Sequence, residues 1–216
     1  MRAFKFLDAH GATVFTANTW PLPRHGQPGA WVEASSVRPC REGIHACTAG
    51  DLAYWINEEL WEIELDGEIQ EAHRKVVARR GRIVRRIDGW AGGVAAAFPV
   101  WCAWRGRDRA VDVFNELGLT PWAQRLSAAV TLGEVASIAK AATAEVGEAN
   151  AGGAIAALAG DAAALASHLG VGAFIVACAA GHAAARVTSD RAGYAAAFAA
   201  ERRAQSHWIA AQLELM

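Results

Sequence analysis

The chain has 216 residues, a hydrophobic content of 53% and a formal net charge of -1 at pH 7. This composition excludes a disordered chain and a general polyanion binder, and the length is sufficient to bury a core without disulfides or metals. The four cysteines lack C-x-x-C spacing and the first residues lack the apolar run of a signal peptide. We therefore expect reduced thiols in a cytoplasmic protein.

The first part of the chain has the patterns of short strands joined by loops. Residues 1–20 carry apolar residues on both sides of a turn sequence, which predicts a β-hairpin whose second strand contains Val14 and Phe15. The prolines and glycines that come next predict a loop. A further short strand is expected at residues 31–34.

A strand–helix–strand pattern follows over residues 40–65. Gly43 allows a sharp turn before a short apolar segment at residues 44–47, which is typical of a buried strand. Thr48 or Asp51 can cap the helix that comes next, because a side-chain oxygen can accept from a free N–H in the first turn.

Alternating apolar and acidic residues indicate a strand that begins at Leu60. Its acidic face carries Glu62 and Glu64, and Asp66-Gly67 has the sequence of a turn that would end the strand. One or two more strands are expected over residues 68–88.

Composition changes near Trp90, where alanine and helix formers replace the strand patterns. Helices are expected over residues 91–104 with a kink at Pro99, 108–117, 154–169, 172–186 and 190–213, with two more beginning at Thr120-Pro121 and at the capping box Thr131–Glu134. The predicted fold is α+β. A mixed or antiparallel sheet domain of residues 1–90 would pack against an alanine-rich helical bundle of residues 91–216.

The segment 162–185 contains no acidic or basic residue except histidine. Its length is close to what a membrane span needs, but it is rich in alanine and glycine, contains His168 and His182, and is interrupted by glycines at 170–172. We interpret it as two closely packed, buried helices and expect no membrane contact.

Paired carboxylates on one face of a strand can divide the roles of acid and base, which makes Glu62 and Glu64 candidate catalytic residues. They can equally be cross-strand partners of the basic run at residues 74–86, in particular of Arg82 and Arg86. The same run can contact phosphate or form a solvated strand face. Nothing in it recognises bases, so we expect no sequence-specific nucleic-acid binding.

His45 and Cys47 lie two residues apart on one strand face, with Cys40 nearby. The pair could act as a nucleophile and its base, but a packed strand histidine is the simpler interpretation. A zinc site would need about four ligands, and the fourth has no candidate, so we expect no metal.

Trp20 lies beside prolines in a loop, and neither it nor Trp31 is easily explained as core. Aromatic side chains at a cleft stack on flat rings, which suggests a nucleotide or another small aromatic ligand. Consecutive strand–helix–strand elements are usually neighbours, so we expect one site there. We predict catalytic roles for His45, Glu62 and Glu64, and ligand contacts for Trp31, Tyr54, Trp55 and Arg82.

The segments GIHAC (43–47) and LWEIELDGEI (60–69) resemble a family of uncharacterised small domains of phages and actinobacteria over residues 3–90. More distantly, the order of elements is similar to small proteins of the ADP-ribosyltransferase fold. That fold uses a His or Arg on its first core strand, an aromatic pair, and a Glu on a later strand. Tyr54 would supply an aromatic residue, and Glu62 or Glu64 the glutamate. Arg2, Lys5 and His45 do not match the position of the first-strand residue. The resemblance implies NAD or another nucleotide as ligand.

The C-terminal segment 183–215 resembles alanine-rich helical segments of bacterial immunity-type proteins, which implies a packing module with a protein partner. Two functions therefore stay open. One is a nucleotide-linked transferase of ADP-ribosyltransferase-like fold, and the other is a non-catalytic binding or immunity-type module. The sequence does not decide whether the protein is an enzyme.

Overall fold

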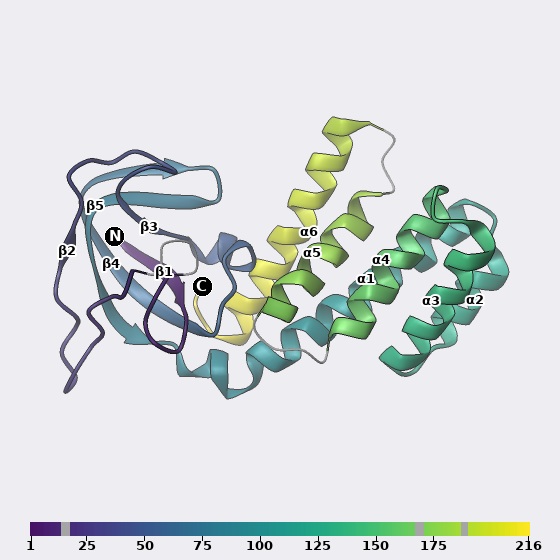
Figure 1. Ribbon diagram of the computed structural model, residues 1–216, viewed down its shortest axis with the longest axis horizontal. Coiled ribbons are helices and arrows are strands. Elements are labelled where there is room, and N and C mark those ends of the chain that lie inside the picture. Colours follow the sequence, from purple (N-terminus) through teal and green to yellow (C-terminus); the bar gives the residue numbers. More distant parts are fainter. Residues whose placement is uncertain (14–17, 167–170, 187–189) are drawn as a thin grey trace. The chain divides into compact units, whose positions relative to one another are not determined.

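The computed structural model describes residues 1–13, 18–166, 171–186 and 190–216 (Figure 1). The second strand of the expected N-terminal hairpin, with Val14 and Phe15, lies outside the described residues. The chain divides into two compact units. The first contains Met1–Val94 and Ser206–Met216, and the second contains Ala95–Gln205.

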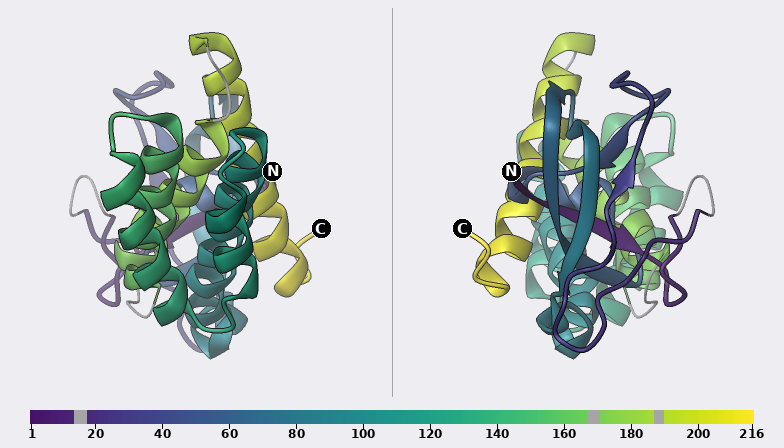
Figure 2. Two further views of the ribbon diagram at one scale, coloured as in Figure 1. Left: turned by 90° about the vertical axis from the view of Figure 1, so that its right-hand side faces the viewer. Right: turned by 90° about the vertical axis from the view of Figure 1, so that its left-hand side faces the viewer.

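The first unit is built on an antiparallel sheet, and together with the helices this confirms the α+β prediction. Its strands are β1 (Arg2–Leu7), β2 (Val32–Glu33), β3 (Ile44–Ala46), β4 (Glu59–Ala72) and β5 (Lys75–Arg86). The sheet order is β1-β4-β5-β2, and β3 also pairs with β5. The long β4–β5 hairpin is seen side-on in the right-hand view of Figure 2.

The strands close on themselves. Phe4 of β1 and Cys47, just after β3, exchange two backbone hydrogen bonds of 2.8 Å, so that hydrogen bonds join β1, β4, β5 and β3 in a ring. Closure of this kind removes exposed strand edges and encloses a core. That core consists of Ala3, Leu7, Ile44, Ala46, Trp61, Ile63, Leu65, Val76, Ala78 and Ile83.

The prediction that Asp66-Gly67 ends its strand is wrong. β4 continues to Ala72, and the pairing with β5 shifts register between Asp66 and Ile69, which is a β-bulge. Gly67 has φ +77°, a conformation that glycine adopts at no steric cost and that turns and bulges share. A turn sequence alone therefore did not distinguish a hairpin end from a bulge.

Short helical turns complete the first unit. The expected helix after β3 is a 3₁₀ turn, η1 (Ala49–Tyr54), and a π turn, η2 (Trp90–Val94), follows β5. A hydrogen bond joins the C-terminal segment to η1: the backbone N–H of Ala53 donates to Ser206 Oγ at 3.0 Å. Residues 206–216 thus belong to the same unit as the strands.

Packed helices form the second unit. They are α1 (Ala95–Glu116), α2 (Thr120–Ala128), α3 (Leu132–Val146), α4 (Ala151–Leu165), α5 (Val171–Ala185) and α6 (Arg191–Gln212), the last of which extends into the first unit. The capping box of Thr131 and Glu134 at the start of α3 is confirmed. The separate helices expected over 91–104 and 108–117 are wrong, because α1 runs without a break from Ala95 to Glu116 and includes Gly106 between the two expected segments. Pro99 lies inside α1.

Small residues allow the helices to approach closely. A Cβ atom placed on Gly106 of α1 would lie 3.8 Å from the Ala159 Cα of α4 and 3.9 Å from the Ala180 Cα of α5. The left-hand view of Figure 2 shows α2, α3 and α4 running side by side. Among the described helices, none combines the length and apolar character that crossing a membrane requires.

The helical unit also buries a polar network on α6. Glu201 and Arg202 are 3% and 1% exposed. Arg105 of α1 donates from Nε and Nη2 to the two carboxylate oxygens of Glu201, at 2.6 and 2.5 Å. Arg202 donates to Gln205 Oε1 at 2.8 Å, and Gln205 donates to the Ala177 carbonyl at 3.0 Å. The buried charge of Glu201 is therefore matched by a bidentate partner.

Candidate functional site

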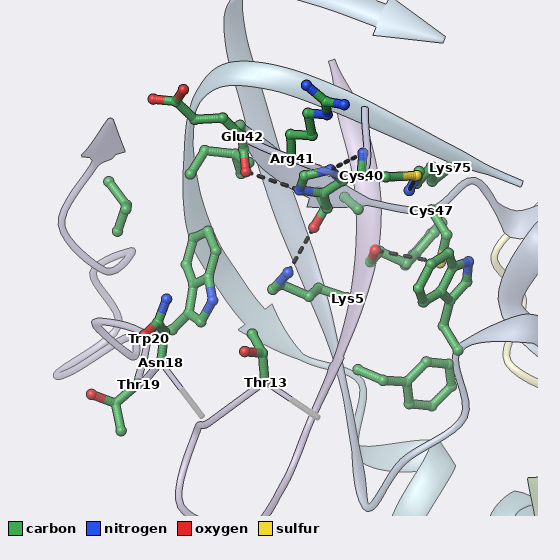
Figure 3. A pocket seen from close by; sticks show the side chains of 18 residues that line it. Lys5, Thr13, Asn18, Thr19, Trp20, Cys40, Arg41, Glu42, Cys47 and Lys75 are labelled. Atoms are coloured by element: carbon green, nitrogen blue, oxygen red, sulfur yellow. Dashed lines mark hydrogen bonds between the residues drawn. The ribbon is translucent and has the colours of Figure 1, made fainter. Parts of the chain in front are cut away.

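The first unit contains a cavity of about 620 Å³ (Figure 3). Its walls come from β1, from Thr13 and residues 18–20, from Val32, from the turn and strand of residues 40–47, from Trp55 and from Lys75 at the start of β5. The lining is mostly apolar, with a few polar side chains among aromatic ones. That combination is typical of sites for small ligands.

Lys5 is the basic residue most enclosed by this cavity. It lies opposite Trp61 in the β1–β4 register, on the strand face that carries the core residue Ala3. Its ammonium group donates to the His45 carbonyl at 2.6 Å and lies 4.9 Å from the centroid of the Trp20 ring. Figure 3 shows Lys5 beside Trp20, with a dashed line for the hydrogen bond that its ammonium group donates.

Burial lowers the pKa of Lys5 from 10.5 to about 8, and the nearby Cys47 thiol opposes this shift. Every ion pair among the described residues uses an arginine, so within that part of the chain neither Lys5 nor Lys75 is paired with a carboxylate. A half-buried ammonium group next to a carbonyl and an aromatic face is partly satisfied, but its charge is not neutralised.

His45 uses both ring nitrogens in the turn before its own strand. Nε2 accepts from the backbone N–H of Cys40 at 3.2 Å, and Nδ1 is 3.0 Å from the Gly43 carbonyl, to which it donates in the neutral tautomer. Burial lowers the pKa of His45, and the charges of Lys75 and Lys5 lower it further. The geometry therefore supports a neutral imidazole that holds the 40–43 turn.

The two cysteines near this turn differ in environment. Cys47 is buried, its thiol donates to the Phe4 carbonyl at 3.4 Å, and burial raises its pKa. These features favour a packed side chain over a nucleophile. Cys40 is exposed, and its sulfur accepts from the Lys75 ammonium at 2.8 Å. Among the described residues, no group of three or more His, Cys, Asp or Glu is arranged to hold a metal ion.

Trp55 also lines the cavity. Its indole N–H donates to the Arg74 carbonyl at 2.8 Å, and the Lys75 ammonium lies 5.9 Å from the centroid of its ring. Trp55 and His45 are thus the two predicted site residues that the structure brings to this cavity.

Glu62 and Glu64 lie instead at a smaller hollow of about 290 Å³, together with Arg2. Glu62 is 3.2 Å from Arg2 and 2.9 Å from Arg85, and Glu64 is 2.7 Å from Arg82. The cross-strand interpretation of Glu64 and Arg82 is therefore confirmed.

Arg86, the other expected partner, pairs instead with Glu59 at 3.2 Å and with Asp88 at 2.6 Å. A cross-strand ion pair between Arg86 and Glu62 or Glu64 was thus the wrong assignment. The cause is a register shift of β4 against β5 after Glu62, which places Arg85 opposite Glu62.

Three further predicted contacts also lie away from the large cavity. Trp31 has Arg80 and Arg82 over its ring at 4.8 and 4.7 Å, and Tyr54 has Arg74 at 4.2 Å. None of Trp31, Tyr54 or Arg82 lines the cavity. The functional roles assigned to these residues stay predictions.

Lys5 and Lys75 were not proposed as site residues from the sequence, and Trp20 was singled out without a site. One signal could have identified Lys5. It stands in the strand RAFKFL, where apolar residues occupy both faces, so that a lysine there has to be at least partly enclosed. Its position near Trp20 depends on tertiary contacts and has no local signature.

Comparison with models of known protein families, with curated proteins and with solved structures finds no match to this chain.

Proposed function

We propose that the first unit binds a small anionic ligand that carries a flat ring, such as a nucleotide, in the cavity around Lys5. The observation that carries this proposal is the Lys5 ammonium group, which lies beside the Trp20 ring without a carboxylate partner among the described residues. An anion would supply the missing charge, and the indole would supply a stacking surface.

The other charges at the cavity support an anionic ligand. Lys75 adds a second ammonium group, which donates to the Cys40 sulfur and lies over the Trp55 ring. The carboxylate at the rim, Glu42, accepts hydrogen bonds from Ser36 and Arg38 at 2.6 Å each, and these bonds lower its pKa. The negative charge of Glu42 is therefore already engaged.

Nucleotide-linked transfer, the activity that the resemblance implies, would use the same class of ligand. It would also need a carboxylate beside the bound nucleotide, and Glu62 and Glu64 are paired with arginines outside the cavity lining. The geometry thus supports binding better than transfer.

Calorimetric titration of the full chain with AMP and NAD tests the proposal. We expect saturable binding at neutral pH that weakens about tenfold between pH 7 and pH 9, as Lys5, with its pKa of about 8, loses its proton. Lys5→Met and Trp20→Ala should each weaken binding by roughly ten- to a hundredfold, the range for a charged hydrogen bond or a stacked ring.

Two matched variants serve as controls. Lys140 is an exposed lysine on α3, and Trp104 is a half-buried tryptophan with Arg107 at 4.8 Å, so Lys140→Met and Trp104→Ala repeat the same changes in the helical unit. Both should leave binding unchanged, as should Glu62→Gln. The absence of binding at millimolar AMP and NAD to the folded protein would refute the proposal.

A further inference from the structure

The basic residues of this chain are distributed unevenly by type. Of 21 lysines and arginines only three are lysines, namely Lys5, Lys75 and Lys140. Two of these three line the cavity, whereas the ion pairs of the described surface all use arginine. Only lysine, and not arginine, readily loses its proton to become a nucleophilic amine.

The surroundings of Lys5 favour the neutral amine. Its neighbours are a backbone carbonyl, an indole ring and a buried thiol, and no carboxylate pairs with it among the described residues. With a pKa of about 8, roughly a fifth of the Lys5 side chains are unprotonated at pH 7.4, against about one in a thousand for an ordinary lysine.

We propose that Lys5 is an imine-forming residue, and that the ligand class of the cavity includes aromatic aldehydes that carry a carboxylate or phosphate. Recognition of the anionic ring rests on the proposed function; the covalent step is additional. The aldehyde carbon would be held near Nζ, while the ring stacks against Trp20, whose centroid is 4.9 Å from that nitrogen.

The step balances without an oxidant or a reductant. The lone pair of the neutral Lys5 amine forms a bond to the carbonyl carbon, and the π electrons of the C=O bond move to oxygen. The resulting carbinolamine loses the oxygen together with both amine hydrogens as water, which leaves a C=N bond. A protonated imine can still donate to the His45 carbonyl, which now accepts from Lys5 at 2.6 Å.

Lys75 is the competing amine in the same cavity. It donates to the Cys40 sulfur at 2.8 Å and lies 5.9 Å from the centroid of the Trp55 ring, in a more open position at the start of β5. Lys140 is exposed on α3, and the amino terminus, which donates to the Leu65 carbonyl, lies outside the cavity lining. The other two lysines, Lys75 and Lys140, are the internal comparisons.

The test is incubation of the full wild-type chain with 4-carboxybenzaldehyde and cyanoborohydride, which reduces imines to stable amines. Peptide mapping by mass spectrometry then locates the adducts. We expect the adduct at Lys5 to form about tenfold or more faster than adducts at Lys75 and Lys140 at pH 7.4, because Lys5 has a larger neutral fraction than an ordinary lysine. Equal rates at all amines, or preferential reaction at Lys75, would overturn the inference.

The alcohol analogue, 4-(hydroxymethyl)benzoate, separates this inference from the proposed function, because it has the ring and the charge but no carbonyl. If the alcohol binds in calorimetry and Lys5 stays unmodified by the aldehyde, binding holds and the imine proposal fails. If Lys5 reacts selectively and excess alcohol does not slow the reaction, the imine proposal holds and recognition of the anionic ring fails. We expect both binding and protection of Lys5.

Discussion

Two regions of this molecule enclose charged side chains, and they do so in opposite ways. In the helical unit Arg105 meets both oxygens of Glu201, so the buried charges are matched within the chain. In the sheet of the first unit Lys5 has a carbonyl and an indole ring as neighbours, but no ion pair among the described residues.

The difference distinguishes a charge that is neutralised within the chain, such as Glu201, from a charge that a ligand could neutralise, such as Lys5. A desolvated charge is costly unless it is paired. The stability of the fold is therefore a sufficient reason for the buried ion pair of Arg105 and Glu201. An enclosed ammonium group without a counter-charge lowers stability, and its lowered pKa expresses that cost. For this reason we place the ligand at Lys5 and assign a structural role to Glu201.

The largest expected effect is on the closed pair. Arg105→Met leaves the Glu201 carboxylate buried without its bidentate partner and should lower the free energy of unfolding by about 3–5 kcal/mol. Urea denaturation measures this change. Arg109→Met is the control on the same helix, because Arg109 is exposed and pairs with Asp112 at 3.3 Å. A loss below about 1 kcal/mol for Arg105→Met would remove the distinction between the two regions.

The second effect has the opposite sign. The Lys5 pKa is lowered from 10.5 in the unfolded chain to about 8 in the folded one, so the folded state binds fewer protons between these values. The charge of Lys5 therefore destabilises the fold by its full amount below pH 8, and this cost disappears as the pH rises to 10.5. Lys5→Met should therefore raise the free energy of unfolding at pH 7 by up to about 3 kcal/mol, and the gain should vanish near pH 10.5.

Chemical denaturation at pH 7 and pH 10, with the wild type and Lys5→Met compared at each pH, isolates the Lys5 contribution. Lys140→Met is the control for the substitution itself, because this lysine is exposed on α3. Destabilisation by Lys5→Met at pH 7 would mean that Lys5 is already well paired and would weaken the case for an anionic ligand.

The smallest effect is expected where charges are paired at the surface. Glu64 and Arg82 are 2.7 Å apart, with side chains 43% and 32% exposed. Glu64→Gln should change the free energy of unfolding by less than about 1 kcal/mol, and less in high salt. A loss above about 2 kcal/mol, measured by urea denaturation at low and high salt, would show that this pair is more than a solvated contact.

Local pattern was sufficient for much of the fold. The alternation of residues 61–65 predicted a strand with a buried face, and Trp61, Ile63 and Leu65 are buried. The Thr131 and Glu134 pair predicted the start of α3, because a cap is made by residues three apart. Asp66-Gly67 shows where local pattern fails, since a bulge and a turn place the same demand on the backbone.

Only part of the candidate site could be predicted from the sequence. His45 and Trp55 were predicted and line the cavity, whereas Glu62 and Glu64 point to arginines at another hollow. Period-two alternation placed both glutamates on one face correctly. It could not show that the cavity would be lined by other residues, because that depends on how β3 closes on β1.

By itself the sequence determined the α+β class, most element positions and the capping box of α3, because these depend on neighbours within a few residues. The side-chain cap expected from Thr48 or Asp51 is not formed, since Thr48 Oγ1 donates to Asp51 instead. Tertiary structure alone decided which charges are enclosed and with what partners. Lys5 faces Trp20 because β1 pairs with β4 and a distant loop covers it, and Glu201 meets Arg105 because two helices far apart in the chain pack together. Desolvation is a property of the whole surrounding structure, and no local period encodes it.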